Sequence, residues 1–138
     1  MFYCELLSGI WIGDTDILVN KRFIEDNNIS VILNCTQLYN FPDNKEIKKI
    51  RLPFSPVRES NSDIFFLREN KEKIMKFLKD NCDENNILIC CYDGKTLSAF
   101  IVALFIATYS KIDKGSIYDI LLTKCDSLNL WCEISLFF

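Results

Sequence analysis

The chain has 138 residues, a length typical of one domain, so we expect a single domain over residues 1–138. Hydrophobic residues make up 49% of it, which is enough apolar surface to form a core and excludes extended disorder. The formal net charge is −3, with 16 basic and 19 acidic residues in small scattered groups. No field of one sign is strong enough to recruit nucleic acid or an anionic membrane, so neither is an expected partner.

Seven cysteines and the absence of histidine limit the chemistry that the chain can offer. The cysteine number is odd, and no pair has the spacing of a CxxC motif or a zinc site. The N-terminal segment lacks the basic flank and cleavage site of a signal peptide. These features predict a reducing compartment, the cytoplasm, with the nucleus as an alternative. Without histidine, chemistry would have to use Cys, Asp or Glu, and we expect no metal or other cofactor.

The first third of the chain predicts a strand, a helix and a second strand. Residues 8–13 alternate and are bounded by glycine, as in a short strand. Asp14 or Asp16 can then cap a helix that runs to about Asn27. The β-branched residues of segment 29–36 are typical of a buried strand.

The middle of the chain predicts another strand and a long amphipathic helix. We expect the strand around residues 48–54, where Pro53 and Pro56 end it. Asp63 can cap a helix over residues 64–81, in which apolar side chains return at intervals of three, four and seven.

The last part begins with a continuous apolar strand over residues 86–91. A tight loop follows, and then an apolar helix over 97–109 that is too short to cross a bilayer. Two further helices are expected over residues 115–124 and 128–138. Strands that alternate with helices predict an α/β fold, with a central, mostly parallel sheet flanked by helices and ligands bound beyond the carboxyl ends of the strands.

The loop after the apolar strand stands at such an end. A strand that ends in cysteine, a short loop with Gly94 and a helix that starts near Ser98 can cradle a phosphate, because loop N–H groups converge beside the positive helix end. The same field would lower the pKa of the Cys91 thiol and favour a nucleophilic thiolate. Taken alone, two adjacent cysteines at a strand end are more often structural, because buried cysteine behaves as a small hydrophobe.

The segment CCYDGKTLS at 90–98 resembles the HCxxGxxRS signature of the cysteine-based protein phosphatases. The flanking sequences are similar to the dual-specificity phosphatases as well. The opening of those proteins resembles SGIWIGDTD and ISVILNCT, and the stretch before their long helix resembles LPF and SDIFF. A later helix of the family resembles GSIYDILLTKC. This resemblance covers nearly the whole chain and implies their fold. It also places Cys91 at the nucleophile, Gly94 at the loop glycine and Ser98 at the hydroxyl that assists the leaving thiolate. The phosphate loop that it implies consists of Cys91, Tyr92, Asp93, Gly94, Lys95, Thr96 and Leu97.

Three departures from the family pattern predict a site that binds phosphate weakly and has little or no phosphatase activity. Leu97 stands where the family has the arginine that grips the phosphoryl oxygens. Its loss costs on the order of 1.5–3 kcal/mol for each charge-assisted bond. Comparable arginines contribute roughly a thousandfold or more to the rate of phosphoryl transfer. Cys90 replaces the usual histidine, and Asp93 brings a carboxylate into a loop meant for an anion.

The general acid of the family has no clear equivalent. Counting from LPF places Pro56 at its position, whereas counting back from SDIFF places Glu59 there, and a glutamate can donate a proton. Lys95 could supply a positive charge to the loop, but its ammonium does not reproduce a guanidinium fork, and we interpret it as a solvated lysine.

These observations leave three functional hypotheses. The favoured one is a catalytically inactive pseudophosphatase that binds a protein partner, such as a phosphoprotein or a signalling protein. The second is a weakly active or atypical enzyme that uses Cys91 with Lys95 and Glu59. The third is a structural homodimer or larger homo-oligomer with a vestigial site. The Ile-, Asn- and Lys-rich composition and the minimal length are similar to those of viral H1-type phosphatases, which would place the protein in a host cell cytoplasm.

Overall fold

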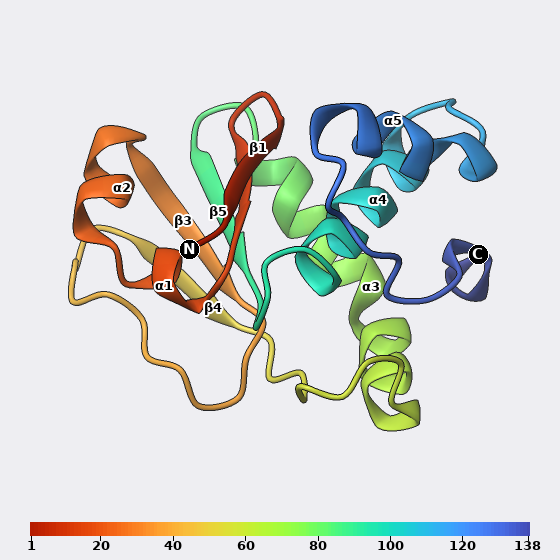
Figure 1. Ribbon diagram of the computed structural model, residues 1–138, viewed down its shortest axis with the longest axis horizontal. Coiled ribbons are helices and arrows are strands. Elements are labelled where there is room, and N and C mark those ends of the chain that lie inside the picture. The colour runs from red at the N-terminus through yellow and green to blue at the C-terminus, as the bar shows by residue number, and fades with distance from the viewer.

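A computed structural model describes residues 1–138 and contains one five-stranded sheet in the order β1-β2-β5-β3-β4 (Figure 1). The strands are β1 (Tyr3–Leu7), β2 (Ile10–Gly13), β3 (Ile29–Asn34), β4 (Lys48–Arg51) and β5 (Asn86–Cys90). Strands β2, β5, β3 and β4 run parallel, which confirms the predicted mostly parallel sheet. The edge strand β1 was not expected. It pairs antiparallel with β2 across a turn at Gly9, whose φ is +79°.

The helices are α1 (Thr15–Leu18), α2 (Lys21–Asp26), α3 (Asn61–Asn81), α4 (Leu97–Tyr109) and α5 (Ile117–Lys124), with short 3₁₀ helices η1 (Lys114–Ser116) and η2 (Ile134–Phe137). Helix α4 spans the predicted residues. No helix has the length and apolar character needed to span a bilayer.

The single helix expected from Asp14 to about Asn27 is wrong, because the chain forms two short helices there. Asp14, one of the two predicted caps, accepts the backbone N–H groups of Asp16 and Ile17 at 3.1 Å each and begins α1. Asn20 then accepts the N–H of Phe23 at 2.9 Å and begins α2. A short amide side chain competes for backbone donors, so Asn20 ends one helix and caps the next.

Several other boundaries differ from the sequence prediction; strand β4, for example, ends at Arg51 and not near residue 54. Helix α3 is capped by Ser60, whose hydroxyl accepts the N–H of Asp63 at 3.2 Å, and Asp63 lies buried in the first turn instead of at the cap. The helix expected over 128–138 is wrong except for one 3₁₀ turn. Long-range bonds hold this segment in an irregular path, for example from Asn129 N–H to the Lys95 carbonyl at 3.1 Å.

The sheet separates two hydrophobic cores. Helices α3, α4 and α5 and the C-terminal segment cover one face, where a cluster of 30 buried residues forms the main core (Figure 1). Helices α1 and α2 lie on the other side, over a smaller cluster of nine. Side chains alternate along β5, so Ile87 and Ile89 belong to the main core while Leu88 and Cys90 belong to the smaller one. Cys91 follows on the side of the main core.

Candidate functional site

The 91–97 loop connects β5 to α4 beyond the carboxyl ends of the central strands. The N–H of Cys91 donates to the Gly13 carbonyl at 3.2 Å, which ties the start of the loop to the end of β2. Gly94 has a φ of +73°, and a Cβ at this position would lie 2.6 Å from the Asp14 nitrogen and 2.6 Å from the Gly13 carbonyl carbon. Both the backbone conformation and the close approach therefore require glycine at position 94.

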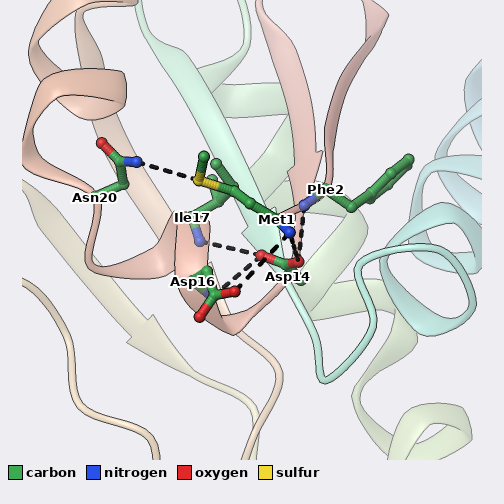
Figure 2. A network of polar contacts seen from close by, with 6 residues as sticks. All are labelled: Met1, Phe2, Asp14, Asp16, Ile17 and Asn20. Atoms are coloured by element: carbon green, nitrogen blue, oxygen red, sulfur yellow. Dashed lines mark hydrogen bonds and ion pairs between the residues drawn. The ribbon is translucent and has the colours of Figure 1, made fainter.

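The turn beneath Gly94 is itself fixed by the Asp14 carboxylate (Figure 2). Its Oδ1 atom caps α1, and its Oδ2 atom accepts the N–H of Phe2 at 2.7 Å, so this one side chain joins the start of α1 to the residue before β1. The N–H of Asp14 donates in return to the Phe2 carbonyl at 3.1 Å. The loop thus rests on a turn that is held from several sides.

Cys91, the predicted nucleophile position, is only 2% exposed. Its Sγ accepts the N–H of Ser98 at 3.4 Å and donates toward Asp93 Oδ1 at 3.6 Å. Burial raises the pKa of the Cys91 thiol above its ordinary value; hydrogen bonding by Ser98 and Gly94 opposes this, and the Asp93 charge adds to it. The expectation of a lowered thiol pKa is therefore wrong, because burial outweighs the field of the loop and helix end.

Asp93 turns its carboxylate onto the donors of its own loop. Oδ1 accepts the N–H groups of Lys95 at 2.9 Å and Thr96 at 3.1 Å, and Oδ2 accepts the Thr96 hydroxyl at 2.7 Å. Partial burial acts to raise the pKa of the Asp93 carboxyl, but these hydrogen bonds outweigh it, so the pKa lies below its ordinary value. The carboxylate is therefore ionised at neutral pH and occupies donors that a phosphate would need.

Leu97 and Ser98 begin helix α4 beneath the loop. Leu97 is 5% exposed and belongs to the main hydrophobic core. Its aliphatic side chain supplies no charge and no hydrogen-bond donor at the position where the resemblance expects an arginine. Ser98 is fully buried, and its hydroxyl makes no well-formed hydrogen bond.

A pocket of about 450 Å³ opens above this loop. It is lined by Ser55, Pro56, Val57, Arg58, Cys91, Tyr92, Asp93, Thr96, Leu97, Asn129 and Trp131. The Leu97 side chain packs in the core, and the space beside it is open. The pocket combines three segments: the connection before α3, the loop, and the C-terminal segment.

Arg58 supplies the one cation among the residues that line this pocket. Its Nε donates to the Trp131 carbonyl at 3.4 Å, and its Nη2 donates to the Leu130 carbonyl. These bonds join the connection before α3 to the C-terminal segment. The guanidinium is thereby held at the pocket, while its side chain remains 57% exposed.

The other residues named from the sequence lie in different places. Pro56 lines the pocket. Glu59 lies at the surface outside the pocket lining, with a φ of +58° and its Oε1 3.6 Å from Arg58 Nε. Lys95 also lies outside the lining, and its Nζ is 5.0 Å from the centroid of the Phe2 ring.

Sequence reasoning missed Arg58, Asn129 and Trp131 as pocket residues. Trp131 is buried and packs against Phe54 and Phe100, with ring centroids 6.0 and 5.3 Å away. Arg58 had one usable signal, since it is the only basic residue between Leu52 and Leu67. Asn129 and Trp131 had none, because an irregular C-terminal segment brings them to the pocket.

A second polar contact at the pocket also escaped the sequence analysis. Ser55, which lines the pocket, donates its hydroxyl to Asp63 Oδ2 at 2.5 Å, and its backbone N–H lies 3.2 Å from both oxygens of that carboxylate. Asp63 is 6% exposed, so this contact satisfies a buried carboxyl group at the start of α3. It fixes the segment that carries Pro56, Val57 and Arg58.

Comparison with known proteins agrees with this architecture. The family model described as the Rit1 DUSP-like domain matches residues 55–127, which is more than half of the chain. No curated protein sequence matches the chain.

Solved structures match over nearly the whole length. Human DUSP28 superposes with a TM-score of 0.82 at 8% identity, over 98% of this chain and 91% of that one. The human tyrosine phosphatase-like serine/threonine/tyrosine-interacting protein superposes with a TM-score of 0.75 at 16% identity, over 96% of this chain and 89% of that one. A leucine rich repeat and phosphatase domain containing protein from Entamoeba histolytica superposes with a TM-score of 0.77 at 18% identity, over 98% of this chain and 89% of that one. At these identities the likeness shows the fold, and it confirms the predicted dual-specificity phosphatase architecture.

Proposed function

This chain belongs to the Rit1 DUSP-like domain family, and we propose that it is a catalytically inactive phosphatase-like domain that acts as a protein-binding module. The observation that carries the proposal is the position of the Asp93 carboxylate on the N–H groups of Lys95 and Thr96. A phosphoryl group entering the loop would meet a fixed negative charge and donors that are already engaged.

The charge balance of the loop supports inactivity further. Phosphoryl transfer depends on groups that stabilise charge on the transferred oxygens. Leu97 offers none, and Lys95 directs its ammonium to the Phe2 ring. The raised pKa of Cys91 keeps its thiol protonated near neutral pH, whereas the nucleophile of such a reaction is the thiolate.

A role in binding is supported by the pocket that remains. A volume of about 450 Å³ lies within the range of binding sites for small groups, and it combines apolar walls with polar donors. Val57 is 61% exposed at this pocket and offers apolar contact area to a partner. The partner that we propose is a protein, such as a phosphoprotein or a signalling protein.

One observation favours the alternative of a weakly active enzyme. Arg58 lines the same pocket as Cys91 and supplies a guanidinium from another segment of the chain. An enzyme that used this pair would hydrolyse phosphate monoesters slowly and would lose that activity in both Cys91→Ser and Arg58→Gln.

Hydrolysis of para-nitrophenyl phosphate tests the proposal. We expect no turnover by the unmodified chain and measurable turnover by the variant that combines Leu97→Arg with Asp93→Ala. The first substitution adds the guanidinium that the family has at this position, and the second removes the carboxylate from the donors of the loop. Adding Cys91→Ser to that double variant is the matched control and should abolish the gained activity. Turnover by the unmodified chain that Cys91→Ser removes would contradict the proposal. Sedimentation equilibrium separates the third hypothesis, since a homo-oligomer with a vestigial site would assemble without any other protein.

A further inference from the structure

We propose that the pocket above the 91–97 loop binds a carboxylate of a partner protein through Arg58, without any need for phosphorylation. This inference rests on the proposed function for the partner being a protein, and goes beyond it by naming the group that is recognised. It assigns a role to Arg58, a residue that the sequence patterns did not single out.

The first argument is the fixed position of the guanidinium. Its Nε and Nη2 atoms donate to the backbone carbonyls of Trp131 and Leu130, so two protein contacts hold the group at the pocket. Both N–H groups of Nη1 have no hydrogen-bond partner in the protein. A guanidinium carries five donors in one plane, so the anchoring bonds leave donors free for a ligand. Arg58 is thus oriented for binding before a ligand arrives.

The second argument is the charge of the pocket. Arg58 and Asp93 are the two charged side chains that line it, one of each sign. Because Asp93 is already bonded to Lys95 and Thr96, its charge stays in place when a ligand enters. A phosphate dianion would leave the filled pocket with an excess of two negative charges, whereas a carboxylate would leave one. The cost of taking an ion out of water rises with the square of its charge, and a pocket lined by one positive and one negative side chain does not offset that cost, so the pocket favours the monoanion.

The third argument is that the carboxylate beside this guanidinium, that of Glu59, does not block it. Glu59 Oε1 is 3.6 Å from Arg58 Nε, on a surface pair in which both side chains are more than half exposed. Exposed pairs of this kind contribute little stability, so Glu59 competes only weakly for Arg58. Glu59 also lies outside the pocket lining, so it leaves Nη1 of Arg58 uncommitted.

The surroundings suit the stem of an acidic side chain. Val57, Leu97 and Trp131 are among the apolar residues that line the pocket; Val57 is exposed, whereas Leu97 and Trp131 are buried. Asn129 adds an amide next to these groups. A glutamate or aspartate of a partner can therefore place its methylene groups on apolar carbon and its carboxylate on Arg58.

Nuclear magnetic resonance titration of the full chain with phenylacetate and, separately, phenyl phosphate tests this inference. We expect phenylacetate to shift the backbone signals of Val57, Tyr92 and Asn129, and to bind more tightly than phenyl phosphate. Arg58→Gln should weaken phenylacetate binding by about tenfold or more, as expected for one lost charge-assisted contact. Arg22→Gln is the matched control: it removes an arginine that pairs only with Asp26 on α2, and should leave both affinities unchanged.

Three outcomes would overturn the inference: no binding of phenylacetate, equal phenylacetate affinity in Arg58→Gln, or tighter binding of phenyl phosphate by the unmodified chain. If Arg58→Gln does not fold, Arg58→Lys replaces it, because lysine keeps the charge but loses the planar fork, and a several-fold weaker affinity is expected. Phenylacetate cannot be hydrolysed, so this arm is read independently of phosphatase activity. Turnover of phenyl phosphate would contradict the proposed function alone.

Discussion

Asp93 and Thr96 are joined twice within the loop, by the Thr96 N–H to Oδ1 at 3.1 Å and by the Thr96 hydroxyl to Oδ2 at 2.7 Å. Together with the N–H of Lys95, these contacts place an internal carboxylate where the loop would bind an anion from outside. The loop keeps the shape of an anion-binding loop, but the Asp93 carboxylate occupies its donors. This relationship leads to the first prediction.

Replacing Asp93 should open the loop to oxyanions. We expect Asp93→Ala to bind tungstate more tightly than the unmodified chain by about tenfold or more, because a charge repulsion is removed and two backbone donors are released. Isothermal titration calorimetry measures the affinity, with Asp43→Ala as the control for the loss of an exposed surface carboxylate. Equal tungstate affinities would mean that the Asp93 carboxylate does not compete with an oxyanion for the donors of the loop.

The Cys91 thiol should react slowly. Because burial raises its pKa and leaves it 2% exposed, little accessible thiolate exists near neutral pH. We expect iodoacetamide to alkylate the half-exposed Cys82 and Cys125 well before Cys91, as peptide mass spectrometry would show. Urea-unfolded protein is the control, in which all three should react at similar rates. Preferential labelling of Cys91 in the folded chain would contradict this account.

Gly94 should tolerate no side chain. Alanine at this position combines a positive φ with a Cβ placed 2.6 Å from backbone atoms of Gly13 and Asp14, which cannot move as a flexible side chain could. We expect Gly94→Ala to lower the free energy of unfolding by about 1–3 kcal/mol. Gly115→Ala is the control, because its nearest new contact is a side-chain oxygen of Asp113 and its φ is not positive. Urea unfolding compares the two, and equal losses would disprove the role of the close approach.

Phe100 should be among the most sensitive core positions. It is fully buried, and its ring lies 5.3 Å from Trp131 and 5.4 Å from Phe137 between centroids. We expect Phe100→Ala to destabilise the chain by about 3–5 kcal/mol through lost burial and the cavity left behind. Phe65→Ala, at a site that is 65% exposed, should change stability by less than about 0.5 kcal/mol. Chemical denaturation measures both, and a small effect of Phe100→Ala would contradict the described packing.

Stability should fall at alkaline pH and not near neutrality. Burial raises the pKa of Cys35 and Cys90 well above the ordinary value of 9.0, and neighbouring cysteines add to this. The folded chain therefore keeps these protons where the unfolded chain loses them, so stability is complete below about pH 9 and declines as pH rises further. Thermal unfolding should show this decline, reduced in Cys35→Ala. Because the chain has no histidine, the midpoint should change little between about pH 6 and 8.

The sequence by itself determined the elements whose signals are local. The apolar run of β5, the glycine of the loop and the apolar start of α4 lie next to one another along the chain, and the structure forms the strand, loop and helix expected there. Leu97, identified in the sequence by its place in the loop motif, packs into the core. Such features follow from residue type and spacing, because hydrophobic periodicity and backbone preference act over a few residues.

Only the tertiary structure decided the properties of the site. Sequence predicted a lowered pKa for Cys91 from the loop and the helix end, but the packing of the whole chain around the thiol raises it instead. Arg58 and Trp131 meet because an irregular C-terminal segment, predicted as a helix, returns to the connection before α3. Burial and long-range hydrogen bonds depend on residues far away in the chain. Their energies arise only when these residues meet in the folded chain, so a local pattern cannot encode them.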